Sequence, residues 1–239
     1  MLRLFSGLAA CIVLSVTAAA QDSESGSPPF DPASIVKVEE DWIVYVQNPD
    51  AELGAPQIVN VLAPTPSTET VFGMIEFNHQ SQPSFRKGGI QVQTWVGDQW
   101  NDLGYSDAVV ALNHTYDKLT YTVGMSRADQ KFKFYVRDGR SKTWGKFAQT
   151  PISAEVPDYQ LNLSTYDPQY SVDNTAISVG AHRVVLMYQK EVRYYSDDEL
   201  EYTDETDRII HRFQDVVQFV SLEEYEQNLS QFNIEITEQ

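Results

Sequence analysis

A polar loop between two expected strands holds the densest set of side chains able to grip a ligand. Asn78, His79, Gln80, Ser81 and Gln82 open this loop, and the run from Arg86 to Gly89 closes it. Amide, imidazole and cationic donors of this kind suit a polyhydroxyl ligand or a carboxylate, and paired glycines permit a bulge or close backbone approach. The alternative is a solvated loop, since a single loop histidine is more often structural than catalytic.

A second candidate site comes from the faces of the expected strands. If Ile90 and Val92 point into the core, alternation directs the next set of side chains away from it. That set consists of Gln91, Gln93 and Trp95, together with Tyr135, Arg137 and Arg193 from two later strands. Aromatic rings stack on the apolar face of a sugar, and amides and charges pair with its hydroxyls. We therefore predict carbohydrate binding by these residues beside Asn78 and His79, against the alternative of ordinary residues on a half-exposed sheet.

Catalytic and metal sites have weaker support. Glu76 or Glu191 with His79 could do acid–base chemistry on a polysaccharide, but the paired-carboxylate strand motif of laminarinase-like enzymes is missing. The sequence also has no nucleophile elbow and no phosphate-binding loop. We predict no catalytic residue and no cofactor, with calcium near Asp167, Asp173 and Asn174 as an alternative.

The elements that would position these residues are short strands. Period-two alternation marks segments near 42–47, 57–62, 71–78, 90–96, 118–126, 131–137, 142–147, 171–179 and 184–195. Strands at such intervals, without a helical period between them, predict an antiparallel β-sandwich over residues 35–196. We therefore expect an all-β fold, preceded by a flexible leader at residues 21–34.

The N-terminal segment has the form of a signal peptide. Arg3 precedes the apolar run Leu4 to Val16, and small residues end at Ala20. We predict cleavage near Ala20 and a secreted or periplasmic protein, with a lipid anchor at Cys11 as the alternative. Cys11 is the only cysteine, so a mature chain starting near Gln21 has no thiol. No later apolar run reaches the length of a transmembrane helix.

The charge balance restricts the partners. The mature chain has 16 basic and 34 acidic residues, a net formal charge of −18, which opposes binding to nucleic acid. Much of this charge lies in residues 197–239. Apolar residues there recur at helical spacing, and Ser221 to Glu224 resembles a capping box. We expect a partly helical acidic extension that covers a sheet edge or binds a partner.

Three stretches carry a resemblance to known proteins. Residues 73–95, 141–147 and 171–196 resemble segments of uncharacterised secreted proteins from planctomycete bacteria. The strand Gln130 to Arg137 followed by Asp138-Gly139 is similar to the sandwich of concanavalin A-like lectins, laminin-G domains and glucanases. The resemblance implies a jelly-roll sandwich and leaves function open, because that fold hosts lectins, adhesion modules and hydrolases alike.

Three functions remain open from the sequence. The first is a secreted, non-catalytic carbohydrate-binding module, and the second is an envelope assembly protein that uses the acidic extension to dock a partner. The third is a polysaccharide-cleaving enzyme. The positions of the candidate side chains in space distinguish these functions, because carbohydrate binding requires Gln93, Trp95, Tyr135 and Arg193 to converge in one groove.

Overall fold

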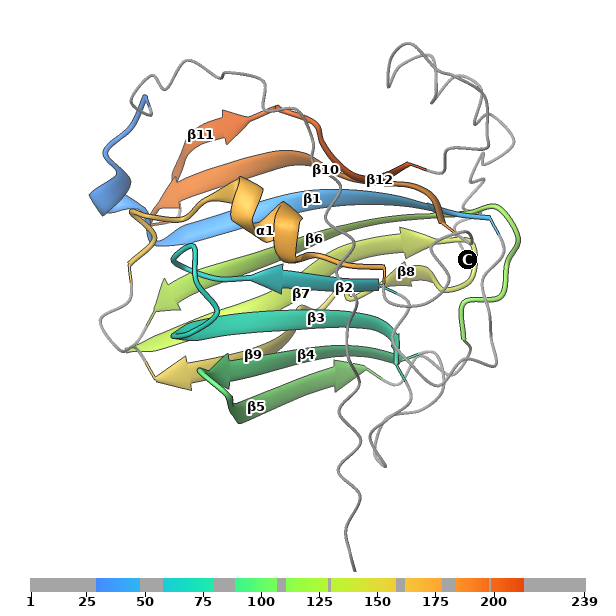
Figure 1. Cartoon of the computed structure of the whole chain (residues 1–239), viewed down its shortest axis with the longest axis horizontal. Helices are drawn as coiled ribbons and strands as arrows, with labels where there is room; N and C mark the ends of the chain where they lie inside the picture. The colour runs from blue at the N-terminus through green and yellow to red at the C-terminus, as the bar shows by residue number, and fades with distance from the viewer. Residues whose placement is uncertain are drawn as a thin grey trace, which may run out of the picture.

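The chain folds into two antiparallel sheets. The computed structural model describes residues 29–47, 58–79, 89–106, 111–128, 130–157, 162–177, 184–197 and 199–212. Sheet A has eight strands in the order β11-β10-β1-β6-β7-β8, with β12 also paired to β10 and β9 to β7. Sheet B has four strands in the order β2-β3-β4-β5. The two sheets are layered one behind the other, with sheet B toward the viewer in Figure 1.

Eight of the twelve described strands fall in segments predicted by alternation, whereas the strands at residues 99–106, 152–157, 199–204 and 208–212 were not predicted. Sheet A contains β1 (Lys37–Val46), β6 (Asp117–Ala128), β7 (Lys131–Ser141), β8 (Gly145–Phe147), β9 (Ile152–Pro157), β10 (Val184–Ser196), β11 (Glu199–Asp204) and β12 (Arg208–Arg212). Sheet B contains β2 (Ile58–Leu62), β3 (Val71–His79), β4 (Gly89–Val96) and β5 (Gln99–Ser106). The all-β sandwich is therefore confirmed.

The core lies between the two sheets. Trp42, Val123 and Phe134 of sheet A are buried against Ile75 and Phe77 of sheet B. The rings of Phe77 and Tyr121 approach to 4.4 Å, centroid to centroid, across the layer. Gly73 permits close packing of the two sheets, because an added Cβ would lie 2.4 Å from the ring of Phe134. This packing leaves the opposite face of each sheet as an outer face.

A short helix replaces a predicted strand. Residues 171–179 were expected to be extended, but α1 spans Pro168–Asn174. Asp167 caps this helix by accepting a hydrogen bond from the backbone N–H of Gln169, and Pro168 suits the first helical turn. The prediction was wrong because alternation in a short segment does not outweigh a cap followed by proline. Helix α1 lies over the gap between β1 and β2 (Figure 1).

Sheet A continues beyond residue 196. Residues 199–212 of the predicted extension form β11 and β12 on the free side of β10, so the prediction of a helix beginning near Ile209 is wrong for Ile209 and Ile210. Arg208 explains part of this arrangement, since its guanidinium donates to Asp204 at 2.5 Å and to Gln189 of β10 at 3.2 Å. Residues 213–239 lie outside the described residues, and so do the predicted signal peptide at 1–20 and most of the leader. At the leader's end, Pro32–Ser34 forms a 3-10 turn, and Phe30 packs 5.0 Å from Tyr194, between ring centroids.

Candidate functional site

The predicted site residues lie on two opposite outer faces rather than in one groove. Gln91, Gln93 and Trp95 of β4 point outward from sheet B, on the side opposite Ile90 and Val92. Tyr135, Arg137 and Arg193 point outward from sheet A. The expected convergence of Gln93, Trp95, Tyr135 and Arg193 is therefore wrong. Asn78 and His79 end β3, and their side chains lie outside the described part of the chain.

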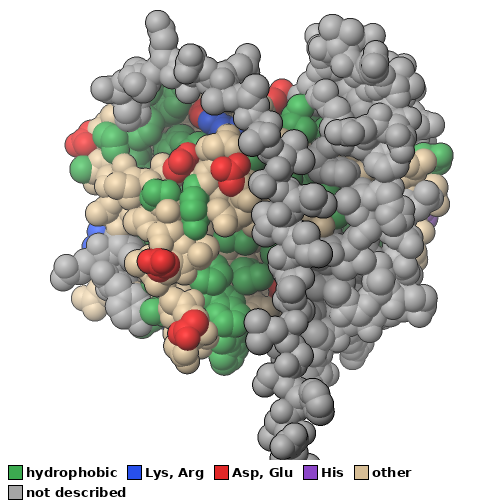
Figure 2. All heavy atoms as spheres, in the orientation of Figure 1, with side chains coloured by type: hydrophobic (Ala, Val, Ile, Leu, Met, Phe, Trp, Pro, Cys, Tyr) green, Lys and Arg blue, Asp and Glu red, His purple; other side chains and the backbone are tan. Residues whose placement is uncertain are grey.

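An aromatic row crosses the outer face of sheet B. Strand pairing places Phe72 of β3 opposite Trp95 of β4, and Trp95 opposite Trp100 of β5. The rings of Phe72 and Trp95 are stacked, with centroids 6.2 Å apart and planes 7° apart. Trp100 is 55% exposed, and Tyr105 farther along β5 is 48% exposed. We call these four residues the aromatic platform, and Figure 2 shows hydrophobic side chains gathered over this side of sheet B.

A carboxylate held by two amides lies next to the aromatic platform. Gln91 and Gln93 donate to Oε2 of Glu76 at 2.7 and 2.6 Å, on the same outer face. The two glutamines are buried rather than free to meet a ligand, contrary to the prediction. Burial raises the pKa of Glu76, and the hydrogen bonds from Gln93 and Gln91 offset this only in part. The amides therefore fix the strand surface on which the aromatic platform stands.

Glu39 organises the outer face of sheet A. Arg137 donates to both carboxylate oxygens of Glu39 at 2.9 and 2.7 Å, and Tyr135 and Tyr195 donate at 2.8 and 3.0 Å. Burial alone would raise the pKa of Glu39, but these hydrogen bonds and the Arg137 charge outweigh it, so the pKa lies below its usual value. Gly124 makes room for this contact, since an added Cβ would lie 2.6 Å from the ring of Tyr135.

Asp41 extends the same network toward the middle of the sheet. Arg193 donates to both oxygens of Asp41 at 2.8 and 2.7 Å, and also to Glu191 at 2.5 Å. Thr122 donates to Asp41 at 2.6 Å. The structure therefore does bring together the predicted residues Tyr135, Arg137 and Arg193. Their polar groups are engaged by acids of the same face, which the sequence analysis did not anticipate.

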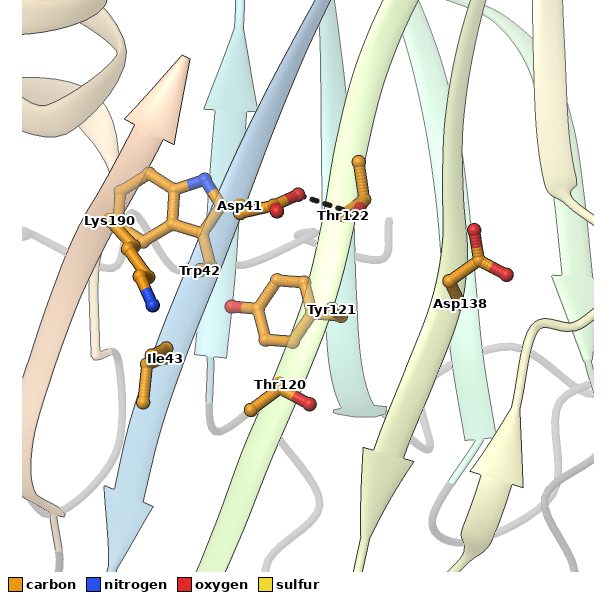
Figure 3. Close-up of a pocket in the computed structure, with 8 residues that line it drawn as sticks. All are labelled: Asp41, Trp42, Ile43, Thr120, Tyr121, Thr122, Asp138 and Lys190. Atoms are coloured by element: carbon orange, nitrogen blue, oxygen red, sulfur yellow. Dashed lines mark hydrogen bonds between the residues drawn. The ribbon is translucent and has the colours of Figure 1, made fainter. Parts of the chain in front are cut away.

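A groove lies beside this network on the outer face of sheet A (Figure 3). Its volume is about 310 Å³, and its polar rim comprises Asp41, Thr120, Thr122, Asp138 and Lys190. Lys190 rises from β10 at one end and Asp138 from β7 at the other, with the two threonines of β6 between them. Ile43 and the buried residues Trp42 and Tyr121 complete the lining. The groove can accommodate a small ligand or one unit of a polymer.

The candidate catalytic and metal residues do not assemble into a reaction site. Glu76 and Glu191 lie on opposite outer faces, so they cannot act on one bond. Asp167 caps α1, and Asp173 accepts a hydrogen bond from Gln169 at 2.8 Å. Among the described residues, no group of three or more His, Cys, Asp or Glu is arranged to hold a metal ion.

Two residues missed by the sequence analysis had a signal in the sequence. Alternation carried back from Trp42 places Glu40 in the core, where it accepts hydrogen bonds from Trp42 at 2.8 Å, Tyr166 at 2.5 Å and Ser171 at 3.0 Å. Gly97-Asp98 signals a tight hairpin, and counting from that turn places Trp100 opposite Trp95. Glu40 is structural, because it ties α1 to β1 inside the sandwich. Trp100 belongs to the outer face.

Comparison with known proteins adds no family. No protein-family model matches the chain, and no curated protein matches it in sequence. One solved structure, described as SCP-B, a member of the Eqolisin family of peptidases, in a complex with the tripeptide Ala-Ile-His, is 11% identical. The match covers 74% of this chain and 83% of that chain, with a TM-score of 0.27. A likeness at this TM-score supports no argument about fold or function.

In the described ranges, the structure contains no helix with the length and apolar character needed to cross a membrane.

Proposed function

We propose that the protein is a secreted, non-catalytic binding module for carbohydrate, and that it binds through the aromatic platform on sheet B. The observation that carries this proposal is the row Phe72, Trp95 and Trp100, which are neighbours across three adjacent strands. Neighbouring strands lie about 4.8 Å apart, so the row presents a continuous surface about 10 Å wide. A sugar ring stacks its C–H face on such a surface.

The exposed residues of β5 give the aromatic platform its contact points. Trp100 and Tyr105 are about half exposed and lie on the same face of β5. Their partners Trp95 and Gln91 are four residues apart on β4, so at about 3.4 Å per residue the two side chains are separated by roughly 14 Å, which allows them to contact different units of one saccharide chain. Glu76, Gln91 and Gln93 hold the neighbouring strands in place. This rigidity reduces the entropy that binding would otherwise cost.

Replacing Trp100 tests the proposal. Purified protein is mixed with a panel of neutral insoluble polysaccharides, and the bound fraction is measured for wild type and for Trp100→Ala. We expect at least a roughly tenfold loss of affinity in the variant, because an aromatic anchor contributes most when it stands at the centre of a contact. The matched control is Leu200→Ala, because Leu200 is 54% exposed but lies on β11 of the other sheet.

Two outcomes would overturn this function. One is wild-type protein that binds no saccharide on a broad glycan array, and the other is Trp100→Ala protein that binds as tightly as wild type.

The same proposal includes a concanavalin A-like jelly roll, a helical extension beyond residue 212 and signal-peptide cleavage near Ala20. The envelope-assembly and polysaccharide-cleaving interpretations stay predictions of the sequence, and a reducing-end assay on the same polysaccharides tests the latter.

A further inference from the structure

The outer face of sheet A concentrates positive charge in a strongly acidic chain. The whole sequence has a formal charge of −17. By contrast, the outward positions of β1, β6, β7 and β10 carry eight cations and four acids, a net of +4. The cations are Lys37, Lys118, Lys131, Lys133, Arg137, Arg140, Lys190 and Arg193, and the acids are Glu39, Asp41, Asp138 and Glu191. We call this set the basic face.

Two arginines bind all four acids of the basic face. Arg137 pairs with Glu39 at 2.7 Å and with Asp138, while Arg193 pairs with Asp41 at 2.7 Å and with Glu191 at 2.5 Å. Lys131 is also paired, with Glu155 of β9. Among the remaining cations, Arg140 and Lys190 are exposed and Lys133 is partly exposed. Their summed field attracts an anion to this side of the molecule.

The groove lies within the basic face and offers groups that pair with hydroxyls. Lys190 stands at one end, and Thr120, which pairs with Arg140 across the strands, lies toward the other. Asp138 adds a carboxylate acceptor, and its backbone φ of 55° sets it at an irregular position in β7. The volume of about 310 Å³ is at the lower end of the range for ligand sites, which suits one unit of a longer chain.

We propose that the basic face binds an anionic polysaccharide, with acidic groups at Lys190 and Arg140 and sugar hydroxyls at Thr120 and Asp138. The ligand class follows from pairing cations with hydroxyl-binding groups. A single-stranded nucleic acid is less suited, because its bases need exposed aromatic rings for stacking. On this face Tyr135 is buried, at 6% exposure, and Lys37 lies 3.9 Å from the ring centroid of Tyr195.

Charge-changing variants of the full mature chain test the proposal in both directions. The probes are polygalacturonate for carboxylates, dextran sulfate for sulfates and dextran as the neutral control, followed by affinity electrophoresis. We expect Lys190→Glu to weaken binding of one or both acidic polymers by roughly fivefold to tenfold, since it replaces an attraction by a repulsion. Lys190→Arg keeps the charge and should bind as wild type does.

Asp138→Asn provides the opposite test. Removing this carboxylate should tighten binding of the acidic polymer by roughly twofold to threefold, because one repulsive charge is lost from the groove. Asparagine tolerates a positive φ, so the fold is preserved. The difference between polygalacturonate and dextran sulfate identifies which acidic group is preferred.

Several results would overturn the proposal. One is that neither acidic polymer binds at low ionic strength, and another is that Lys190→Glu binds as wild type does. A third is that polyglutamate or single-stranded DNA binds equally well, which would indicate attraction to any polyanion.

The basic face is independent of the aromatic platform. Trp100→Ala should leave polygalacturonate and dextran sulfate binding intact, and Lys190→Glu should leave binding of neutral polysaccharide intact, so the two proposals fail separately.

Discussion

The two outer faces of the sandwich are built from different chemistry although both belong to antiparallel sheets. The outer face of sheet A is fixed by arginine–carboxylate pairs centred on Glu39 and Asp41. Strands β2 to β5 contain no lysine or arginine, and the outer face of sheet B is fixed by glutamines and stacked rings instead. The same fold therefore presents one face suited to charge and another suited to apolar ring surfaces.

The difference is clearest in two buried glutamates. Glu39 and Glu76 are both nearly inaccessible to solvent, at 2% and 5% exposure. Burial acts on each to raise the pKa, but Arg137 and two tyrosines bring the pKa of Glu39 below its usual value. Glu76 has only neutral amide donors, so its pKa stays raised. Both glutamates are buried, so the difference comes from the cationic partner. The face with Arg137 stabilises the charged carboxylate, and the face with amide donors stabilises the neutral carboxyl group.

The largest expected effect is the loss of Glu39. Glu39→Ala would leave Arg137, Tyr135 and Tyr195 without their common acceptor, and we expect a loss of about 3 kcal/mol in the free energy of unfolding at pH 7. Urea denaturation followed by tryptophan fluorescence measures it. Glu191→Ala is the matched control, because it removes a single more exposed partner of Arg193 and should cost less than about 1 kcal/mol. Equal losses in the two variants would contradict a central role for Glu39.

Much of this architecture was accessible from the sequence. Alternation correctly placed Gln91, Gln93 and Trp95 on one face opposite Ile90 and Val92, and it placed Tyr135 and Arg137 together. Alternation gives the face of a strand but not the sheet to which the strand belongs. The prediction that the candidate side chains converge in one groove was therefore wrong, because β4 pairs within sheet B while β7 and β10 pair within sheet A.

The remaining misses have local physical causes. The predicted helical spacing begins at Ile209 and Ile210, but pairing with β10 places these two residues in strand β12. The same pattern without a tertiary partner would be ambiguous. The burial of Gln91 and Gln93 could not be predicted either, because it depends on Glu76 lying opposite Gln91 across the β3–β4 pair.

The second prediction concerns pH and sharpens the contrast between the two glutamates. Glu76 has a raised pKa, so its contribution to stability is present below about pH 4.5 and is lost as pH rises through the folded-state pKa. Relative to wild type, Glu76→Gln should therefore become more stable between pH 4.5 and pH 8. Glu39 has a lowered pKa, so its contribution is present above about pH 4.5 and is lost as pH falls further.

The pH comparison uses stability differences, which remove the contributions of other groups. Urea midpoints of wild type, Glu76→Gln and Glu39→Gln are measured from pH 3 to pH 8. The wild-type advantage over Glu39→Gln should grow with pH, while the difference for Glu76→Gln should move in the opposite sense. Buried Glu40 also has a raised pKa and is present in all three proteins, so it cancels. Parallel curves for the two variants would show that the two faces do not differ in this way.

The smallest expected effect comes from an exposed ion pair at the margin of the basic face. Lys131 lies 2.6 Å from Glu155, but the two side chains are 59% and 36% exposed. Such a pair contributes less than about 0.5 kcal/mol and is screened by salt. Lys131→Met should therefore lower stability slightly in 0.05 M NaCl and not measurably in 0.5 M NaCl. The backbone of Glu155 is held separately by Asp102 at 2.9 Å and Asn101 at 2.8 Å, so the substitution leaves that backbone in place. A loss as large as that of Glu39→Ala would mean that exposed charges, rather than the buried carboxylate, hold this face together.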